Sequence, residues 1–230
     1  PKGDTPKKTT LQRIGGDNIG TRGVITKGNK ATDTAPKRYP YSFRPRLFWH
    51  FLLVISGKAG YSFKKGITTM EQELEQVKQA CQTCQKCPLG QTRTHIVFSD
   101  GRPNHKIMLI GEAPGFHEDQ TGKPFVGRAG QLLDKILESV GLSREKDVYI
   151  CNTLKCRPPD NRDPLPAEKA ACRAYLDAQL AILKPRIIIL CGRVALTSFL
   201  TESKSISKIR GQWFDGPYGS KMMPIFHPSY

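Results

Sequence analysis

Short apolar runs alternate with amphipathic segments between residues 106 and 228. The runs are KIMLIG (106–111), DVYICNT (147–153), RIIILCG (186–192) and KMMPIFHP (221–228). Residues 127–141 and 166–184 instead repeat their apolar positions at helical spacing. Apolar strands alternating with helices are typical of a parallel sheet that is buried on both faces. The pattern therefore predicts an α/β protein.

Polar or glycine-rich residues follow three of these runs. The segment GEAPG covers residues 111–115, Asn152 closes the second run, and His227 closes the fourth. Each alone has an ordinary explanation, namely a tight turn, a cap or a turn residue before proline. Ligands of open parallel sheets bind beyond the carboxyl ends of the strands. We therefore expect these residues to converge on one cleft.

The composition changes near residue 69. Residues 1–69 contain many more basic than acidic residues and are interrupted by glycines and prolines. We interpret 1–69 as a disordered basic segment or a non-native extension. The apolar run 47–55 in it is either a short strand or a segment that docks on the main body. A helix is expected from Met70, with Thr68 and Glu71 at capping-box spacing.

The net charge of the whole chain is +16, which favours a polyanionic partner such as nucleic acid. The run 47–55 is well short of the roughly 20 residues that a membrane-spanning helix needs. No secretory signal is evident, and seven cysteines are an odd number for a disulfide framework. We expect a cytoplasmic protein without a membrane partner.

Three cysteines, Cys81, Cys84 and Cys87, are separated by two residues each. This spacing lets a chain loop around one metal centre, either zinc or an iron–sulfur cluster. The alternative is accidental spacing. Cys151 and Cys191 lie inside apolar runs and are interpreted as core residues.

Five motifs together resemble one enzyme family. They are GEAPG, TGKPFVGRAGQLL, NTLKCRPPDNRDPLP, IRGQWF and the terminal HPSY, and they occur in the order typical of the iron–sulfur uracil-DNA glycosylases called family 4. The resemblance runs from about Cys84 to Tyr230. It implies a three-layer sandwich around a four-stranded parallel sheet, and release of uracil from single- or double-stranded DNA, in base excision repair.

The resemblance also implies a [4Fe–4S] cluster and its ligands. The family pattern matches Cys84, Cys87, Cys156 and Cys172, which leaves Cys81 as a departure that could replace a neighbour. The cluster is expected to be structural. From the spacing of the cysteines alone, a zinc site is the alternative to the cluster.

The site residues implied by the resemblance surround a flipped uracil. Asn152 reads the Watson–Crick edge, Phe125 stacks on the base, and His227 donates to uracil O2 as the base departs. Glu112 and Glu118 are the catalytic carboxylates, with the division of roles between them left open. The remaining substrate-binding positions are Gly111, Ala113, Pro114 and Gly115.

Two further features bear on activity. The family's wedge of leucine and arginine follows HPS, whereas this sequence ends at Tyr230, so we expect residues 70–230 to be a glycosylase domain that lacks its C-terminal end. No histidine lies between Ser198 and Phe226, so we expect no covalent trapping of DNA, which a related branch achieves with a histidine there.

Other functions are alternatives to a uracil-DNA glycosylase. A non-catalytic iron–sulfur or zinc module would bind nucleic acid without releasing uracil, and a truncated glycosylase would be inactive. Another α/β hydrolase is disfavoured because there is no G-x-S-x-G nucleophile motif. We expect a monomer. The basic residues near the motifs are candidates for phosphate contacts: Lys123, Arg128, Lys155, Arg157, Arg162, Lys208 and Arg210.

Overall fold

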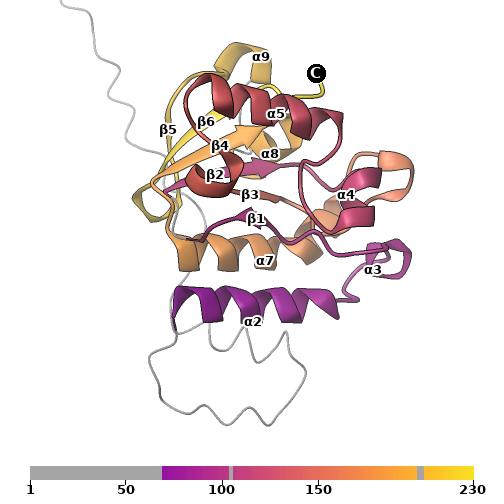
Figure 1. Cartoon of the computed structure of the whole chain (residues 1–230). Helices are drawn as coiled ribbons and strands as arrows, with labels where there is room; N and C mark the ends of the chain where they lie inside the picture. Colours follow the sequence, from indigo (N-terminus) through magenta and orange to yellow (C-terminus); the bar gives the residue numbers. More distant parts are fainter. Residues whose placement is uncertain (1–68, 104–105, 201–204) are drawn as a thin grey trace, which may run out of the picture. The chain divides into compact units, whose positions relative to one another are not determined.

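The computed structural model describes residues 69–103, 106–200 and 205–230 (Figure 1). The expectations for residues 1–68, including the apolar run 47–55, fall outside the described residues. Within them, no helix is both long enough and apolar enough to cross a membrane.

The sheet has six strands in the order β1-β3-β2-β4-β6-β5. Its centre is parallel and consists of β2 (Ile107–Gly111), β3 (Val148–Asn152), β4 (Ile187–Cys191) and β6 (Lys221–Ile225). The edges are β1 (Asp100–Gly101) and β5 (Phe214–Asp215), and both pair antiparallel to their neighbours. The sequence-based expectation of a four-stranded parallel sheet was therefore too narrow, because the sheet is mixed.

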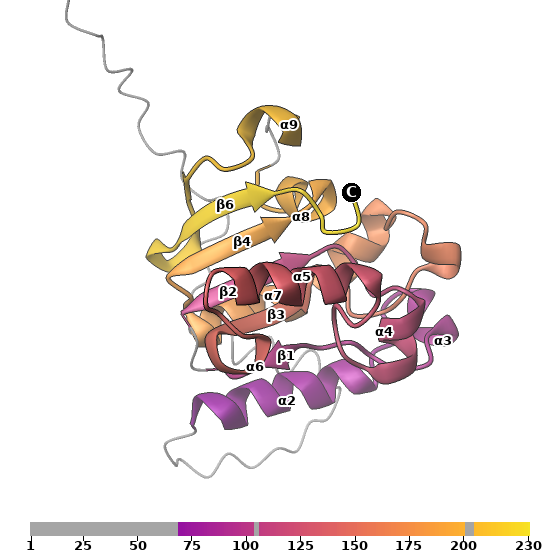
Figure 2. The same ribbon diagram turned by 45° about the horizontal axis from the view of Figure 1, so that its top comes forward.

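Helices cover both faces of this sheet. On one face lies α5 (Arg128–Ser139), and on the other lies α7 (Pro166–Leu183), with α2 (Met70–Gln82) packed on the outside of α7 (Figures 1 and 2). The remaining helices are short: α3 (Leu89–Thr92), α4 (Phe116–Thr121), α6 (Arg144–Asp147), α8 (Arg193–Thr197), α9 (Ile206–Ile209), η1 (Pro159–Asn161) and η2 (Pro217–Gly219).

The alternation of side chains along β2 explains why the central strands are apolar throughout. Met108 and Ile110 belong to the cluster that includes Leu176 and Leu180 of α7. Leu109 belongs to the cluster that includes Leu133 of α5. Neither face of the strand meets water, so neither position tolerates a polar residue.

Helix α2 begins at Met70, as expected, but its capping box lies one residue later than the sequence pattern suggested. The N-cap is Thr69, whose hydroxyl accepts from the Gln72 backbone N–H, while the Gln72 side chain accepts from the Thr69 N–H. The capping box is therefore Thr69 with Gln72, instead of the expected pair of Thr68 and Glu71. The buried face of α2 consists of Leu74, Val77 and Cys81.

The parallel strands end on the same side of the molecule. Gly111 at the end of β2 is the register partner of Asn152 at the end of β3. The arrowheads of β4 and β6 point toward the C-terminal residues (Figure 2). This edge of the sheet therefore carries the residues that the sequence singled out.

Candidate active site

Gly111, Asn152 and Phe125 meet at one point of the sheet edge. A β-carbon added to Gly111 would lie 2.4 Å from Asn152 Oδ1 and 2.6 Å from Phe125 Cζ. No side chain fits there, so glycine is required for close approach rather than for its backbone angles. The predicted convergence of the GEAPG segment with Asn152 is present in the structure.

The loop after β2 is tied to the loop after β3 by main-chain contacts. Thr153 N–H donates to Gly111 O at 3.0 Å, and Leu154 N–H donates to Glu112 O at 3.1 Å. In the same loop, Pro114 is buried, while Ala113 packs against the cluster of Leu89, Leu154 and Cys156. Main-chain hydrogen bonds therefore join the two loops.

Asn152 holds a buried side-chain amide without a partner among the described residues. Its residue is 2% exposed, and no side-chain hydrogen bond joins its amide to any other residue of 69–103, 106–200 or 205–230. A buried amide without partners is costly in a folded protein. Such a group is best explained by a polar ligand that supplies one acceptor and one donor.

Phe125 is held in an unusual backbone conformation. Its φ is 53°, in the left-handed region that a bulky residue rarely adopts. The Arg144 guanidinium donates to the carbonyl oxygens of Pro124 and Phe125, which fixes the turn from one side. The residue is 5% exposed, and this conformation places its ring against Gly111 at the edge of the sheet.

Glu118 fixes the same turn from the other side. Its Oε1 accepts from the backbone N–H groups of Val126 and Gly127, both at 2.9 Å. Its Oε2 accepts from the Gly115 N–H at 3.1 Å. Both oxygens are therefore occupied by main-chain donors that join the GEAPG segment to the Phe125 turn.

His227 stacks beside Phe125. The ring centroids are 5.5 Å apart with an interplanar angle of 27°. The Ser229 backbone N–H donates to His227 Nδ1 at 3.2 Å, so Nδ1 acts as an acceptor and the neutral ring carries its hydrogen on Nε2. Burial lowers the pKa of His227, opposed by the negative charge of Glu118. The histidine is therefore a neutral Nε2–H donor near pH 7.

Glu112 is the carboxylate of the segment that keeps its side chain available. It is partly exposed, and no side-chain hydrogen bond is made by it within the described residues. Burial raises the pKa of Glu112, and Asp163 raises it further, while Arg193 and Lys169 act in the opposite direction. The two candidate carboxylates thus differ, because Glu118 is fixed and Glu112 is not.

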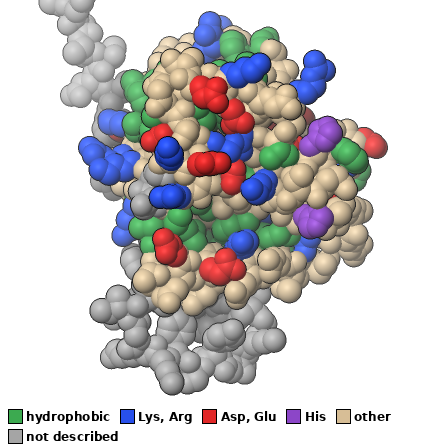
Figure 3. Space-filling view, in the orientation of Figure 1, with side chains coloured by type: hydrophobic (Ala, Val, Ile, Leu, Met, Phe, Trp, Pro, Cys, Tyr) green, Lys and Arg blue, Asp and Glu red, His purple; other side chains and the backbone are tan. Residues whose placement is uncertain are grey.

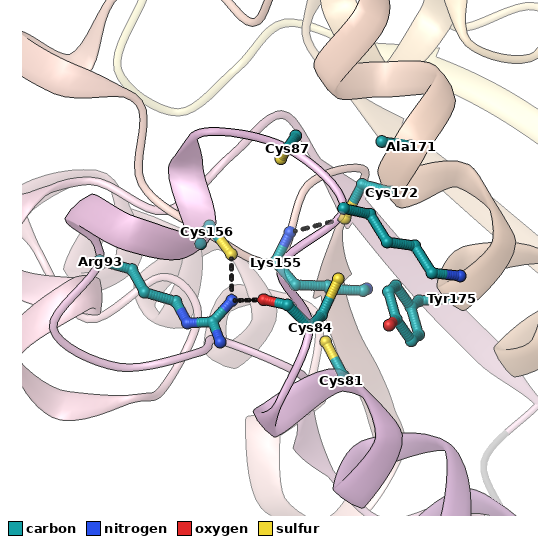
Figure 4. A pocket seen from close by; sticks show the side chains of 11 residues that line it. Cys81, Cys84, Cys87, Arg93, Lys155, Cys156, Ala171, Cys172 and Tyr175 are labelled. Carbon is teal, nitrogen blue, oxygen red and sulfur yellow. Dashed lines mark hydrogen bonds between the residues drawn. The ribbon is translucent and has the colours of Figure 1, made fainter. Parts of the chain in front are cut away.

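Five cysteines line a second cavity, which lies beside the loop after β3 (Figure 4). They come from three places: the end of α2 and the segment after it, the loop after β3, and α7. The five are Cys81, Cys84, Cys87, Cys156 and Cys172, and all of them are free thiols. Within the described residues, no three such side chains converge closely enough to form a single-ion site.

Two N–H donors point at the sulfur atoms of this cavity. Arg93 Nη1 donates to Cys156 Sγ at 3.2 Å and also to the Cys84 carbonyl oxygen (Figure 4). The Lys155 backbone N–H donates to Cys172 Sγ at 3.3 Å. Such donors favour thiolates, which is how cysteines bind metals. Four of the five cysteines and their donors thus fit a thiolate-bound metal cluster.

Cys81 differs from the other four cysteines. It is 1% exposed and packs among Val77, Phe98 and Tyr175. Burial raises the pKa of Cys81, and so do the neighbouring Cys172, Cys156 and Cys84, while Lys155 opposes them. Its surroundings are those of a core residue at the wall of the cavity.

One of the basic residues expected to contact phosphates is in the interior. Lys155 is 0% exposed and cannot reach a phosphate group on the surface. Arg162 pairs with Glu168 at 2.6 Å. In the face drawn in Figure 3, basic and acidic side chains are interspersed, so its charge is locally balanced.

This arrangement matches one protein superfamily. A model of the uracil DNA glycosylase superfamily matches residues 98–230. This range includes the residues described at the sheet edge and two of the five cavity cysteines. The chain therefore belongs to the uracil DNA glycosylase superfamily.

Comparison with individual relatives shows which type of enzyme within the superfamily this chain resembles. The type-4 uracil-DNA glycosylase of Thermotoga maritima is 48% identical over 163 residues, which cover 70% of this chain and 84% of that protein. The type-4 enzyme of Archaeoglobus fulgidus is 42% identical over 165 residues, covering 69% of this chain and 82% of that protein. The type-5 enzyme of Thermus thermophilus is 33% identical over 147 residues, covering 56% and 67%. Within the superfamily, the similarity thus lies with the type-4 enzymes.

Proposed function

We propose that this protein removes uracil from DNA by hydrolysing the bond between the base and its sugar. The observation that carries the proposal is the buried, unpartnered amide of Asn152 at the edge of the sheet. Uracil presents an N3–H donor and an O4 acceptor, which match the carbonyl and the NH2 of that amide. Cytosine presents the reverse pattern and would leave both groups unpaired.

The neighbouring rings would hold the flipped base. Removing a base from the stack takes a few kcal/mol, and least where the base is mismatched. Phe125 supplies an aromatic face, which contributes about 1–3 kcal/mol per base in comparable sites. Because its turn is fixed by Arg144 and Glu118, the face is in place before the base arrives.

Bond cleavage would leave the electron pair of the glycosidic bond on uracil. His227 donates its Nε2–H to uracil O2, where the negative charge develops. No proton has to be transferred, because a neutral donor is sufficient to stabilise the anion. The Ser229 contact to Nδ1 keeps the donor on the correct nitrogen.

Water completes the reaction at the sugar carbon. Glu112 is the carboxylate that is free to orient this water and to take its proton, since both oxygens of Glu118 are occupied. The products are free uracil and an abasic site. Glu118 is a positioning residue in this scheme.

We further propose that the cysteine cavity holds a [4Fe–4S] cluster bound by Cys84, Cys87, Cys156 and Cys172. The support is that these thiols line one cavity and receive N–H donors at two of their sulfurs. When bound, the cluster would join the segment after α2 to the loop after β3 and to α7. It supplies structure rather than chemistry at the base.

The direct test is incubation of the protein with an oligonucleotide that contains one uracil, followed by alkali. The proposal expects strand cleavage at the uracil position only after alkali, together with free uracil. Binding of the oligonucleotide without release of uracil would support a non-catalytic module instead. The monomeric state and the cytoplasmic location remain predictions.

A further inference from the structure

Lys155 lies between the two sites described above. It follows β3 by three residues and lines the cysteine cavity, yet its side chain is fully buried. Figure 4 shows it among the side chains of Cys84, Cys172 and Tyr175 that line the same cavity. A buried lysine in this place needs an explanation, because lysine is almost never fully buried without a partner.

The ammonium group is anchored to the base-reading residue. Lys155 Nζ donates to the backbone oxygen of Asn152 at 2.8 Å and to Gln179 Oε1 at 2.6 Å. It also lies 5.6 Å from the centre of the Phe98 ring. The Asn152 main chain is therefore held from the side of the cysteine cavity.

The other end of the residue is anchored to that cavity. Its backbone N–H donates to Cys172 Sγ at 3.3 Å. One residue thus contacts both the base reader and a cysteine of the cavity.

The partners of the ammonium are neutral. In the part of the chain that the structure describes, no ion pair joins Lys155 to a carboxylate. An uncompensated buried charge is costly. Cysteines that bind a metal lose their protons, so a loaded cysteine centre would bring negative charge next to this cation.

We propose that Lys155 is a positioning residue that couples the cysteine centre to the base pocket: its ammonium balances the charge of the loaded centre while holding the Asn152 main chain in place. The inference rests on the proposed function, because it needs both an occupied cysteine centre and a base at Asn152. It predicts that loss of the Lys155 charge changes both the reduction potential of the cysteine centre and the affinity for uracil.

The competing explanation is that Lys155 only fills space and satisfies two oxygens. In that case, loss of its charge would not change the electronic properties of the centre. Lys155→Met distinguishes the two, since methionine keeps an unbranched chain and removes the charge. Lys86→Met is the matched control, because Lys86 lines the same cavity but is exposed to solvent.

Two measurements on the full iron-loaded chain test the proposal. The first is the reduction potential of the cysteine centre, followed by its visible absorption. A cation favours the reduced, more negative state, so Lys155→Met should shift the potential to more negative values, and Lys86→Met much less. The second is the dissociation constant of free uracil, which should rise about 10–100-fold in Lys155→Met, the loss expected for one hydrogen bond from a charged donor.

A Lys155→Met protein with the wild-type potential and wild-type uracil affinity would overturn the inference. Should that variant not fold, Gln179→Glu decides, because it places a carboxylate against the same ammonium. It should also shift the potential to more negative values, with a smaller loss of uracil affinity since the contact to Asn152 is kept. An unchanged potential in Gln179→Glu would overturn the inference.

The wild-type measurements separate this inference from the proposed function. A wild-type chain that holds no iron overturns both the cluster and the coupling. A wild-type chain that holds iron and excises uracil, with both readouts unchanged in the variants, overturns the coupling alone.

Discussion

In the proposed function, the distinction between uracil and cytosine depends on a single amide, that of Asn152. Because the side chain is buried and makes no other hydrogen bond within the described residues, both its donor and its acceptor are available to the base. Asn152→Ala should lower the single-turnover rate of uracil excision about 100-fold or more, since the pocket loses both a donor and an acceptor. The rate is measured on a uracil-containing oligonucleotide with enzyme in excess.

Asn152→Asp tests the same role of Asn152 through the choice of base. A protonated aspartate donates where the amide accepts, so cytosine should become a weak substrate while uracil excision falls. Asn161→Asp is the matched control, because Asn161 is exposed and only accepts from Arg157. Wild-type uracil rates in Asn152→Ala would show that another group reads the base.

The dependence of the rate on pH follows from His227 and Glu112. The pKa of His227 is lowered by burial, so the ring is already neutral around pH 6.5 and above, where a free histidine would titrate. The pKa of Glu112 is raised by burial, and the carboxylate acts only when ionised. The rate should therefore be flat from about pH 7 to 8 and fall on acidification, at a pH above that of an ordinary glutamate.

Variants of Glu112 and His227 show which of the two groups causes the fall in rate at acidic pH. Glu112→Gln should lower the plateau and remove the limb, whereas His227→Gln should lower the plateau and keep the limb. A wild-type rate that rises as the pH is lowered through about 6.5, with the rise absent in His227→Gln, would mean that the imidazolium is the donor.

Among the elements, the beginnings of α4 and α5 are joined by the Glu118 carboxylate. It accepts three backbone N–H groups, from Gly115, Val126 and Gly127. Glu118→Gln should lower the free energy of unfolding by about 1–3 kcal/mol, because an amide nitrogen then faces N–H donors. Excision should fall as well, since the Phe125 turn loses one of its two supports.

Denaturant unfolding and uracil release on the same samples check this expectation. Glu138→Gln on the exposed side of α5 is the control and should change neither. A Glu118→Gln variant of unchanged stability that has lost all excision would instead give Glu118 a direct chemical role.

The cysteine cavity joins α2, the loop after β3 and α7, and each of its cysteines can be tested separately. Serine at Cys84, Cys87, Cys156 or Cys172 should remove the brown colour of the protein and its broad absorption near about 400 nm, a range typical of iron–sulfur centres. Serine at Cys151 or Cys191 should not, because both are buried in the core clusters.

Cys81 is the informative case. Its packing among core residues predicts that Cys81→Ser keeps the iron but lowers stability. Iron analysis and absorption spectra measure this. Loss of iron in Cys81→Ser, together with retention in Cys84→Ser, would replace Cys84 by Cys81 in the ligand set.

At the scale of the whole molecule, the sequence predicted the features that depend on local pattern. Continuous apolar runs are required of strands buried on both faces, so β2, β3, β4 and β6 could be located. The edges β1 and β5 could not, since two residues carry no periodic signal. The convergence of Gly111, Asn152 and His227 was predictable because the first two end parallel strands and His227 follows the end of another, β6, by two residues.

Contacts between distant segments were not predictable. Nothing in the sequence links Glu118 to the N–H groups of residues 126 and 127, and the roles of the two glutamates separate only once those contacts are known. Lys155 in KCRPP looks like a surface charge, and only the packing of α7 against the loop after β3 buries it. In the sequence, its neighbour Cys156 was singled out, as a cluster ligand implied by the family resemblance.

The measurement that tests the central claim most directly is uracil release from an oligonucleotide that carries one uracil beside ordinary cytosines and thymines. The account predicts free uracil and an alkali-labile site at that position, with none at cytosine, and loss of both products in Asn152→Ala. Tight binding of the same oligonucleotide without any release of uracil, or strand cleavage that needs no alkali, would contradict it.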